Sequence, residues 1–223
     1  MKQFPPLGRA AALAVVALGL AVASAQARPP VNEVEYYIPP LSNGNVNPNP
    51  FLASGVSAGG GVAIYWSAGT GPAARNTAAP ANTPERYIDT EQFPGGVLPQ
   101  GVTITEAQGL NTLARIKENL EANGLTLEDV MFMRIYLEKP PGETRADYNG
   151  WNRAYRKYFA NVDLVTGEVI PAYEPVFVAN PRRPARSNLE VATLPVLGWL
   201  VEIEVIAAYP PRVKLPTPPA RPQ

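Results

Sequence analysis

The chain has 223 residues, 46% of them hydrophobic, which is enough for one domain with a sizeable core and short for two. Cysteine and histidine are both absent, which excludes disulfides, cysteine nucleophiles, Ser-His-Asp triads and the usual Cys/His zinc sites. Any chemistry must therefore come from carboxylates, arginine, lysine, tyrosine, hydroxyl groups and the backbone.

The first 27 residues have the pattern of a secretion signal. Lys2 and Arg9 form a positive start, residues 10–22 are apolar, and Ala25-Gln26-Ala27 is a small-residue cleavage site. We expect a mature chain that begins at Arg28 and is periplasmic or secreted. The alternative is an uncleaved membrane anchor, but the apolar run is shorter than the roughly 20 residues that a spanning helix needs, so we expect no stable membrane insertion.

Cleavage would leave 17 basic and 19 acidic residues. Nucleic-acid binding normally shows a basic surplus concentrated on one face, and no run of lysine and arginine supplies one here. We therefore expect no nucleic-acid partner.

The N-terminal third predicts short strands and loops. Residues 34–38 are suited to an edge strand before Pro39-Pro40 ends it, and residues 51–57 and 61–66 are typical of a hairpin. A phosphate-binding loop is the alternative for the glycines between them, but no helix follows, so a turn is favoured. Residues 72–101 carry no sustained period and predict a long surface loop or insertion.

A helix is predicted next, because apolar residues recur at helical spacing. Thr105 and Gln108 form a capping box, and Asn123-Gly124 ends the element. A short turn at residues 126–129 leads into a predicted strand at 130–137. The periodic apolar positions of the helix are Leu110, Leu113, Ile116 and Leu120.

A second helix is predicted over residues 146–160, followed by a loop-like insertion at 161–184. Its aromatic residues share one helical face, which is typical of a core stripe; the alternative is a cofactor-binding face. These residues are Tyr148, Trp151, Tyr155 and Phe159.

The last predicted elements are strands at 189–194 and 199–208, separated by a turn at 195–198. From Pro210 onward the proline content predicts an extended or disordered tail. The order β-β-β-α-β-α-β-β indicates a single α+β domain over residues 28–209, with helices on one face of a mixed sheet.

Two charged groups near the C-terminus are candidates for chemistry. Side chains alternate along a strand, so Glu202 and Glu204 share one face, which is either solvated or lines a cleft. Within a cleft, partial burial would raise the pKa of a carboxyl group and suit it to proton transfer. Arg186 precedes the strand that we expect to pair with the glutamate strand, and it is either a surface charge or a group that binds a carboxylate.

The C-terminal sequence resembles the signature of the RidA/YjgF family. The matching blocks are PARSNLEVATLP at 184–195 and VEIEVIA at 201–207. Agreement continues at residues 113–130, and Asn152 and Tyr155 occupy an Asn-x-x-Tyr pattern. The resemblance covers roughly residues 49–209 apart from the insertions near 72–101 and 161–184.

This resemblance implies a chorismate-mutase-like (YjgF-like) fold, a homotrimer with ligand clefts between subunits, and hydrolysis of small 2-imino acids to 2-keto acids and ammonia. It implies no metal or organic cofactor. Arg186 would hold the substrate carboxylate, and Glu202 would position or activate the hydrolytic water. The remaining positions implied to bind substrate are Phe51, Gly69, Asn152 and Asn188.

Three residues depart from the family pattern. Phe51 stands where a tyrosine is common, Ala68 replaces a serine next to Gly69, and Asn188 replaces a cysteine or serine. Two alternatives to the deaminase therefore stay open. One is a non-catalytic trimer that binds small carboxylates or partner proteins. The other is a nuclease or translation inhibitor, which the acidic charge and expected export disfavour.

Overall fold

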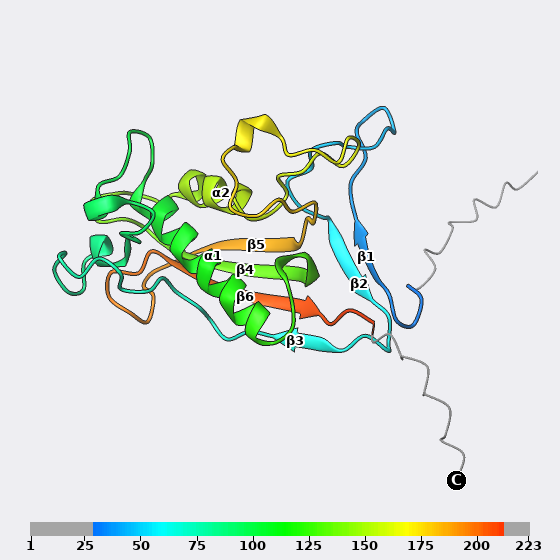
Figure 1. The fold of residues 1–223 in the computed structure, drawn as a ribbon, viewed down its shortest axis with the longest axis horizontal. Coiled ribbons are helices and arrows are strands. Elements are labelled where there is room, and N and C mark those ends of the chain that lie inside the picture. The colour runs from blue at the N-terminus through cyan, green and yellow to red at the C-terminus, as the bar shows by residue number, and fades with distance from the viewer. Residues whose placement is uncertain (1–28, 212–223) are drawn as a thin grey trace, which may run out of the picture.

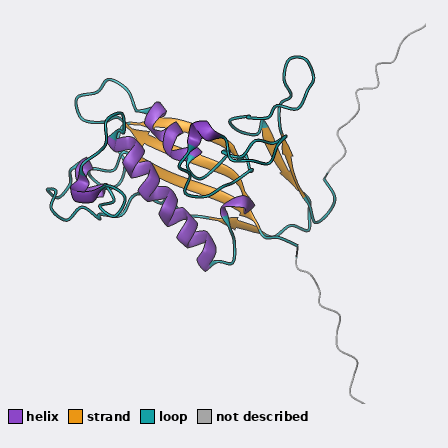
Figure 2. Ribbon diagram, turned by 45° about the horizontal axis from the view of Figure 1, so that its top comes forward, coloured by secondary structure: helices purple, strands orange, loops and turns teal. Residues whose placement is uncertain are grey.

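The computed structural model describes residues 29–211. In chain order its helices and strands are β1 (Val34–Tyr37), β2 (Gly55–Ala58), β3 (Ile64–Trp66), α1 (Ile104–Ala122), β4 (Val130–Glu138), α2 (Tyr148–Arg156), β5 (Ala185–Val191) and β6 (Val201–Ala208). Four strands form a mixed sheet in the order β3-β6-β4-β5, and β1 and β2 form a separate small sheet (Figure 1). Both helices lie on one face of the larger sheet (Figure 2). The predicted α+β architecture is confirmed.

The sheet is antiparallel except between β4 and β5, which run parallel and are connected through α2. A strand-helix-strand unit of this kind places its two strands in the same sheet with the helix packed across them. As a result β4 lies between β5 and β6, and β5 forms one edge of the sheet.

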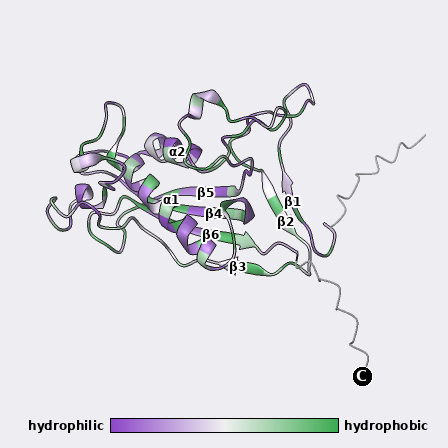
Figure 3. Ribbon diagram, viewed as in Figure 1, coloured by the Kyte–Doolittle hydropathy of each residue, from purple (hydrophilic) through white to green (hydrophobic). Residues whose placement is uncertain are grey.

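The core lies between the sheet and the helices. Along β4, Met133, Ile135 and Leu137 are fully buried, and their partners Val205, Ile203 and Val201 on β6 are equally buried. The intervening residues of both strands face the other side of the sheet, as the period of two requires. Figure 3 shows both hydrophobic and hydrophilic residues along the strands of this sheet.

The aromatic residues of the predicted second helix belong to the core, as predicted, but α2 is shorter than the predicted 146–160 because it ends at Arg156, before Phe159, and Tyr148 is only half-buried. The side chains of Trp151, Tyr155 and Phe159 are fully buried. The ring centroids of Tyr155 and Phe159 are 5.5 Å apart with nearly parallel planes, which is a stacked pair. At Gly109 the helix α1 approaches α2 closely, because a Cβ there would lie 2.9 Å from the Cβ of Ala154.

The start of α1 differs from the prediction. Thr103 caps the helix, and its hydroxyl accepts a hydrogen bond from the backbone of Glu106 at 3.2 Å. The predicted capping box of Thr105 and Gln108 is wrong, because both residues lie inside the helix and are fully buried. Gln108 instead donates to the backbone carbonyls of Pro84 and Gly198. The predicted end is confirmed at Asn123, with Gly124 at a φ of 73°.

The predicted hairpin at 51–66 is also wrong. β2 pairs with β1, which confirms the strand predicted at 34–38, whereas β3 pairs with β6. The glycines between β2 and β3 contact the chain before β1: the backbone N–H of Gly59 donates to Glu33 and that of Gly61 to Val31. A Cβ on Gly59 would overlap backbone atoms of Val31, so this close approach requires glycine.

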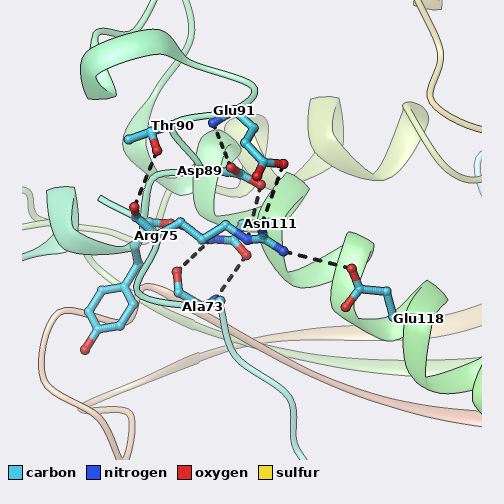
Figure 4. A network of polar contacts seen from close by, with 8 residues as sticks. Ala73, Arg75, Asp89, Thr90, Glu91, Asn111 and Glu118 are labelled. Carbon is cyan, nitrogen blue, oxygen red and sulfur yellow. Dashed lines mark hydrogen bonds and ion pairs between the residues drawn. The ribbon is translucent and has the colours of Figure 1, made fainter. Parts of the chain in front are cut away.

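Residues 72–101 form more than a surface loop. Ile88 and Phe93 pack into the core, and two short 3₁₀ turns interrupt the segment. Figure 4 shows the polar contacts that fasten it to α1: Asn111 exchanges two hydrogen bonds with the backbone of Ala73, and Arg75 forms an ion pair with Glu118. Arg75 also pairs with Asp89 and Glu91 within the segment.

The strand predicted at 189–194 is β5, which starts and ends earlier, at Ala185–Val191. The reason is that the chain pairs with β4 directly after Pro184. The segment 161–184 contains a 3₁₀ turn at Pro171–Tyr173 and is closed by hydrogen bonds between Asn161 and Asn180. The predicted secretion signal, and the predicted tail from residue 212 onward, lie outside the described residues. Between residues 29 and 211, none of the helices combines the length and hydropathy of a membrane span.

Candidate active site

Arg186 lies on the edge strand β5 and points toward the helices. It pairs in register with Met133, and Asn188 pairs with Ile135, so both side chains share the face of the buried core residues. The Nη2 of Arg186 donates to the Oδ1 of Asn152 on α2 at 2.7 Å. Its guanidinium carbon lies 4.3 Å from the ring centroids of both Phe51 and Tyr155, and these rings are stacked with centroids 5.5 Å apart, so the charged group packs against the stacked pair.

This guanidinium retains unused hydrogen-bonding capacity. The Nε and Nη1 of Arg186 and the Oδ1 of Asn188 are buried and have no hydrogen-bond partner among residues 29–211. Arg186 forms no ion pair with any carboxylate in that part of the chain. A buried donor without a partner is costly, and a charged one more so. A bound carboxylate would satisfy it.

Burial lowers the pKa of Arg186 to about 10, with Tyr155 opposing that shift and Arg156 adding to it. The group is therefore still positive at neutral pH and keeps its attraction for an anion. Burial raises the pKa of the Tyr155 hydroxyl to about 12, so this ring stays neutral beside it. Its hydroxyl donates to the backbone carbonyl of Phe51 at 3.2 Å, which fixes the two rings against which the guanidinium packs.

Glu202 lies on the opposite face of the sheet. It pairs in register with Tyr136 on β4, one of the residues that point away from the helices. Gly69 lies against it, because a Cβ on residue 69 would overlap the Oε1 of Glu202. Burial, and then the neighbouring Glu204, raise the pKa of the Glu202 carboxyl. Glu204 forms an ion pair, in which its carboxylate accepts a hydrogen bond from the guanidinium of Arg134 at 3.0 Å.

The expected pairing of the arginine strand with the glutamate strand is therefore wrong. β4 separates β5 from β6, and within one chain Arg186 and Glu202 point to opposite faces. The predicted residues fall into two groups. Arg186, Phe51, Asn152 and Asn188 lie together on the helix side, and Glu202 and Gly69 lie together on the open face.

Two functional features escaped sequence reasoning. Tyr155 was expected only in the core, yet its ring also forms one side of the Arg186 site. Arg183 is almost completely buried and donates to the carbonyls of Pro50, Pro181 and Val162, so it fastens the chain before Phe51 to the segment before β5. The contiguous Arg182-Arg183 pair gave no signal that one side chain is exposed and the other buried.

The environment of Glu202 predicts a pH-dependent effect on stability. Because its pKa is raised in the folded chain, stability is lost as pH rises from its ordinary value of 4.5 through the higher folded value. A Glu202→Gln variant carries no charge, so its melting temperature should exceed that of the wild type at pH 7, by on the order of 1 °C for a partly solvated group. At pH 4 the two should coincide.

Thermal unfolding at both pH values, followed by circular dichroism, measures this difference. Glu143→Gln, at an exposed turn, is the matched control and should show no gain at either pH. A Glu202→Gln variant that is less stable than the wild type at pH 7 would show that the ionised carboxylate is stabilised by the fold.

Comparison with known proteins places these residues in a family. The protein-family model described as Endoribonuclease L-PSP matches residues 96–209, just over half of the chain. The chain belongs to this family. The matched segment contains α1, β4, α2, β5 and β6, and with them Arg186 and Glu202. The resemblance to the RidA/YjgF proteins is thereby confirmed.

The chain is also similar to individual proteins. A RutC family protein from Saccharolobus solfataricus is 32% identical over 102 residues, which are 46% of this chain and only 60% of that protein. A YjgF family structure from Mycobacterium tuberculosis is 22% identical, with 70% of this chain and 86% of that chain covered and a TM-score of 0.37. The YjgF gene product of E. coli is 22% identical, with 65% and 80% covered and a TM-score of 0.36.

Proposed function

We propose that this chain is an exported deaminase that hydrolyses small 2-imino acids to 2-keto acids and ammonia. The observation that carries the proposal is the buried guanidinium of Arg186, whose Nε and Nη1 have no partner among the described residues. A charged guanidinium with free N–H groups suits a carboxylate, which accepts charge-assisted hydrogen bonds from it. Asn152 and the Phe51 and Tyr155 rings hold it ready for that contact.

The chemistry requires little beyond positioning and proton transfer. Water adds to the C=N carbon of the iminium and loses a proton, which gives a tetrahedral carbinolamine. The nitrogen then gains a proton, the C–N bond breaks as the hydroxyl group loses its proton, and the departing ammonia takes up that proton, so the products are the 2-keto acid and ammonium. Glu202 is suited to accept the proton from water and return it to nitrogen, because a carboxyl group with a raised pKa exchanges protons more readily near neutral pH.

This mechanism needs more than one copy of the chain, because Arg186 and Glu202 face opposite sides of one sheet. We propose a homotrimer in which Arg186 of one subunit and Glu202 of the next share a cleft. Two features support an assembly: β5 is a sheet edge, and the face that carries Glu202 is not covered by α1 or α2 (Figure 2). That uncovered face includes Trp66, whose side chain is 72% exposed.

A coupled assay tests the proposed activity. D-amino-acid oxidase and catalase produce 2-iminopropanoate from D-alanine, and the rate of pyruvate formation is compared with and without the chain, purified after expression of the full sequence. We expect the chain to accelerate hydrolysis above the spontaneous rate, and sedimentation to give the mass of a trimer. Binding of pyruvate without any acceleration would instead support the non-catalytic carboxylate-binding trimer.

A further inference from the structure

A second cationic pocket adjoins the Arg186 site. It has a volume of about 310 Å³ and lies between α2 and the Pro171–Tyr173 turn of the 161–184 segment. Phe51 and Asn152, which contact Arg186, form one side of it. Arg156, Lys157, Ala172 and Tyr173 form much of the rest. The pocket therefore adjoins the site that we propose for the substrate carboxylate and shares two residues with it.

The positive charge of this pocket is not neutralised within the described chain. Arg153 and Glu106, which also line it, form an ion pair with each other at 2.7 Å. Arg156 and Lys157 form no ion pair with a carboxylate among residues 29–211. Their charges add to that of Arg186, so the combined site attracts an anion with more than one negative charge.

Arg156 is oriented to bind such an anion. Its guanidinium carbon lies 4.3 Å from the Phe51 ring centroid and 4.6 Å from that of Tyr173, so two rings flank the planar group. Its hydrogen bonds to Asn49, Pro50 and Ala160 all come from Nη1. Its Nε is buried without a partner in the described chain, which leaves the Nε and Nη2 edge available for a carboxylate. Burial lowers the pKa of Arg156.

Phe51 connects the two sites. The guanidinium carbons of Arg156 and Arg186 each lie 4.3 Å from the centroid of this one ring. A molecule with carboxylates at both ends of a short carbon chain can reach both groups across it. A substrate with an apolar end would leave the Nε of Arg156 buried without a partner.

We infer that this pocket is a second carboxylate subsite and that the substrates are 2-imino acids with an acidic side chain. The inference rests on the proposed function, because it names the substrate class of the same site. It also gives a role to the 161–184 segment, which supplies Tyr173 and Ala172 to the pocket and whose carbonyl at Tyr173 accepts from the Nζ of Lys157 at 2.8 Å.

Binding of two product-like keto acids tests the subsite without relying on catalysis. 2-Oxoglutarate and 2-oxopentanoate have the same length and the same keto-acid end, and differ only in the far carboxylate. Isothermal titration of the wild type should give 2-oxoglutarate a Kd about tenfold or more below that of 2-oxopentanoate, as one added charge-assisted contact implies. Equal affinities, or no binding of either acid, would overturn the inference.

Variants locate the preference. Lys157→Gln and Arg156→Gln should each bring the ratio of the two Kd values toward one, whereas Lys117→Gln, on the exposed side of α1, should keep the wild-type ratio. Arg156 also binds backbone carbonyls, so its substitution can unfold the chain. In that case the Kd ratio of the Lys157→Gln variant tests the subsite, because Lys157 is less buried. A wild-type ratio in folded Lys157→Gln would contradict the assignment.

The two proposals can fail separately. Accelerated hydrolysis of 2-iminopropanoate with no preference for 2-oxoglutarate would leave the deaminase and remove the subsite. A preference for 2-oxoglutarate that depends on Lys157, without acceleration of any imine, would leave the subsite and remove the deaminase.

Discussion

Replacing Arg186 with methionine is expected to lower kcat/KM for 2-iminopropanoate by roughly 10²- to 10⁴-fold. Two charge-assisted hydrogen bonds to the substrate carboxylate are lost, and each contributes about 1.5–3 kcal/mol. In the free protein Nε and Nη1 have no partner among residues 29–211, so within that part of the chain the side-chain hydrogen bond that the substitution removes is the one from Nη2 to Asn152. The coupled pyruvate assay measures the change.

The same substitution should not weaken the fold. Methionine replaces a partly buried cation that forms no ion pair in the described chain, and such replacements are often neutral or stabilising. The substitution also removes the hydrogen bond to Asn152 and the contacts with the Phe51 and Tyr155 rings, so the melting temperature should stay close to that of the wild type. A large loss of stability would indicate that Arg186 is mainly structural, in the manner of Arg183.

Two further variants sharpen the test. Arg186→Lys keeps the charge but loses the planar guanidinium and its several N–H donors, so its loss of activity should be intermediate. Arg182→Met is the matched control, because this exposed neighbour stacks over Tyr36 and lies outside the site. If Arg186→Met keeps its kcat/KM within about threefold of the control, a range expected of surface changes, the carboxylate-binding role is wrong.

The elements with a clear period were predictable from the sequence, and the pairing of strands was less so. Apolar positions in α1 and the β-rich content of β4 mark these elements locally. The partners of β2 and β3 depend on contacts with distant segments, so a glycine cluster between two strands did not establish a hairpin. The position of β5 beside β4 could have been predicted, because a strand-helix-strand order favours parallel neighbouring strands.

The candidate site was predictable only in part, because it too depends on how distant strands pair. Alternation along β6 shows that Glu202 and Glu204 share a face, but it does not relate that face to the one that Arg186 uses on another strand. Only the register of both strands against β4 decides this. The aromatic rings around Arg186 come from Phe51 and Tyr155, which are 104 positions apart, and no local pattern reveals that contact.

The opposite orientation of Arg186 and Glu202 leads to the second large expected effect, which is recovery of activity between two inactive variants. Arg186→Met and Glu202→Gln chains should each be nearly inactive alone. If a site takes its arginine from one subunit and its glutamate from the next, a hybrid trimer can contain intact sites. For random assembly of equal amounts in a cyclic trimer, about a quarter of the sites are intact. Co-expressed, differently tagged chains should therefore show about a quarter of wild-type activity.

A doubly substituted chain provides the control for this experiment. Arg186→Met co-expressed with a chain that carries both Arg186→Met and Glu202→Gln contains no intact arginine, so its hybrids should stay inactive. A site built within one subunit would leave the first pair of variants equally inactive, since neither chain has both groups. Recovery in the first pair alone therefore supports a cleft shared between subunits. It would agree with the positions of Arg186 and Glu202 on opposite faces of the sheet of one subunit.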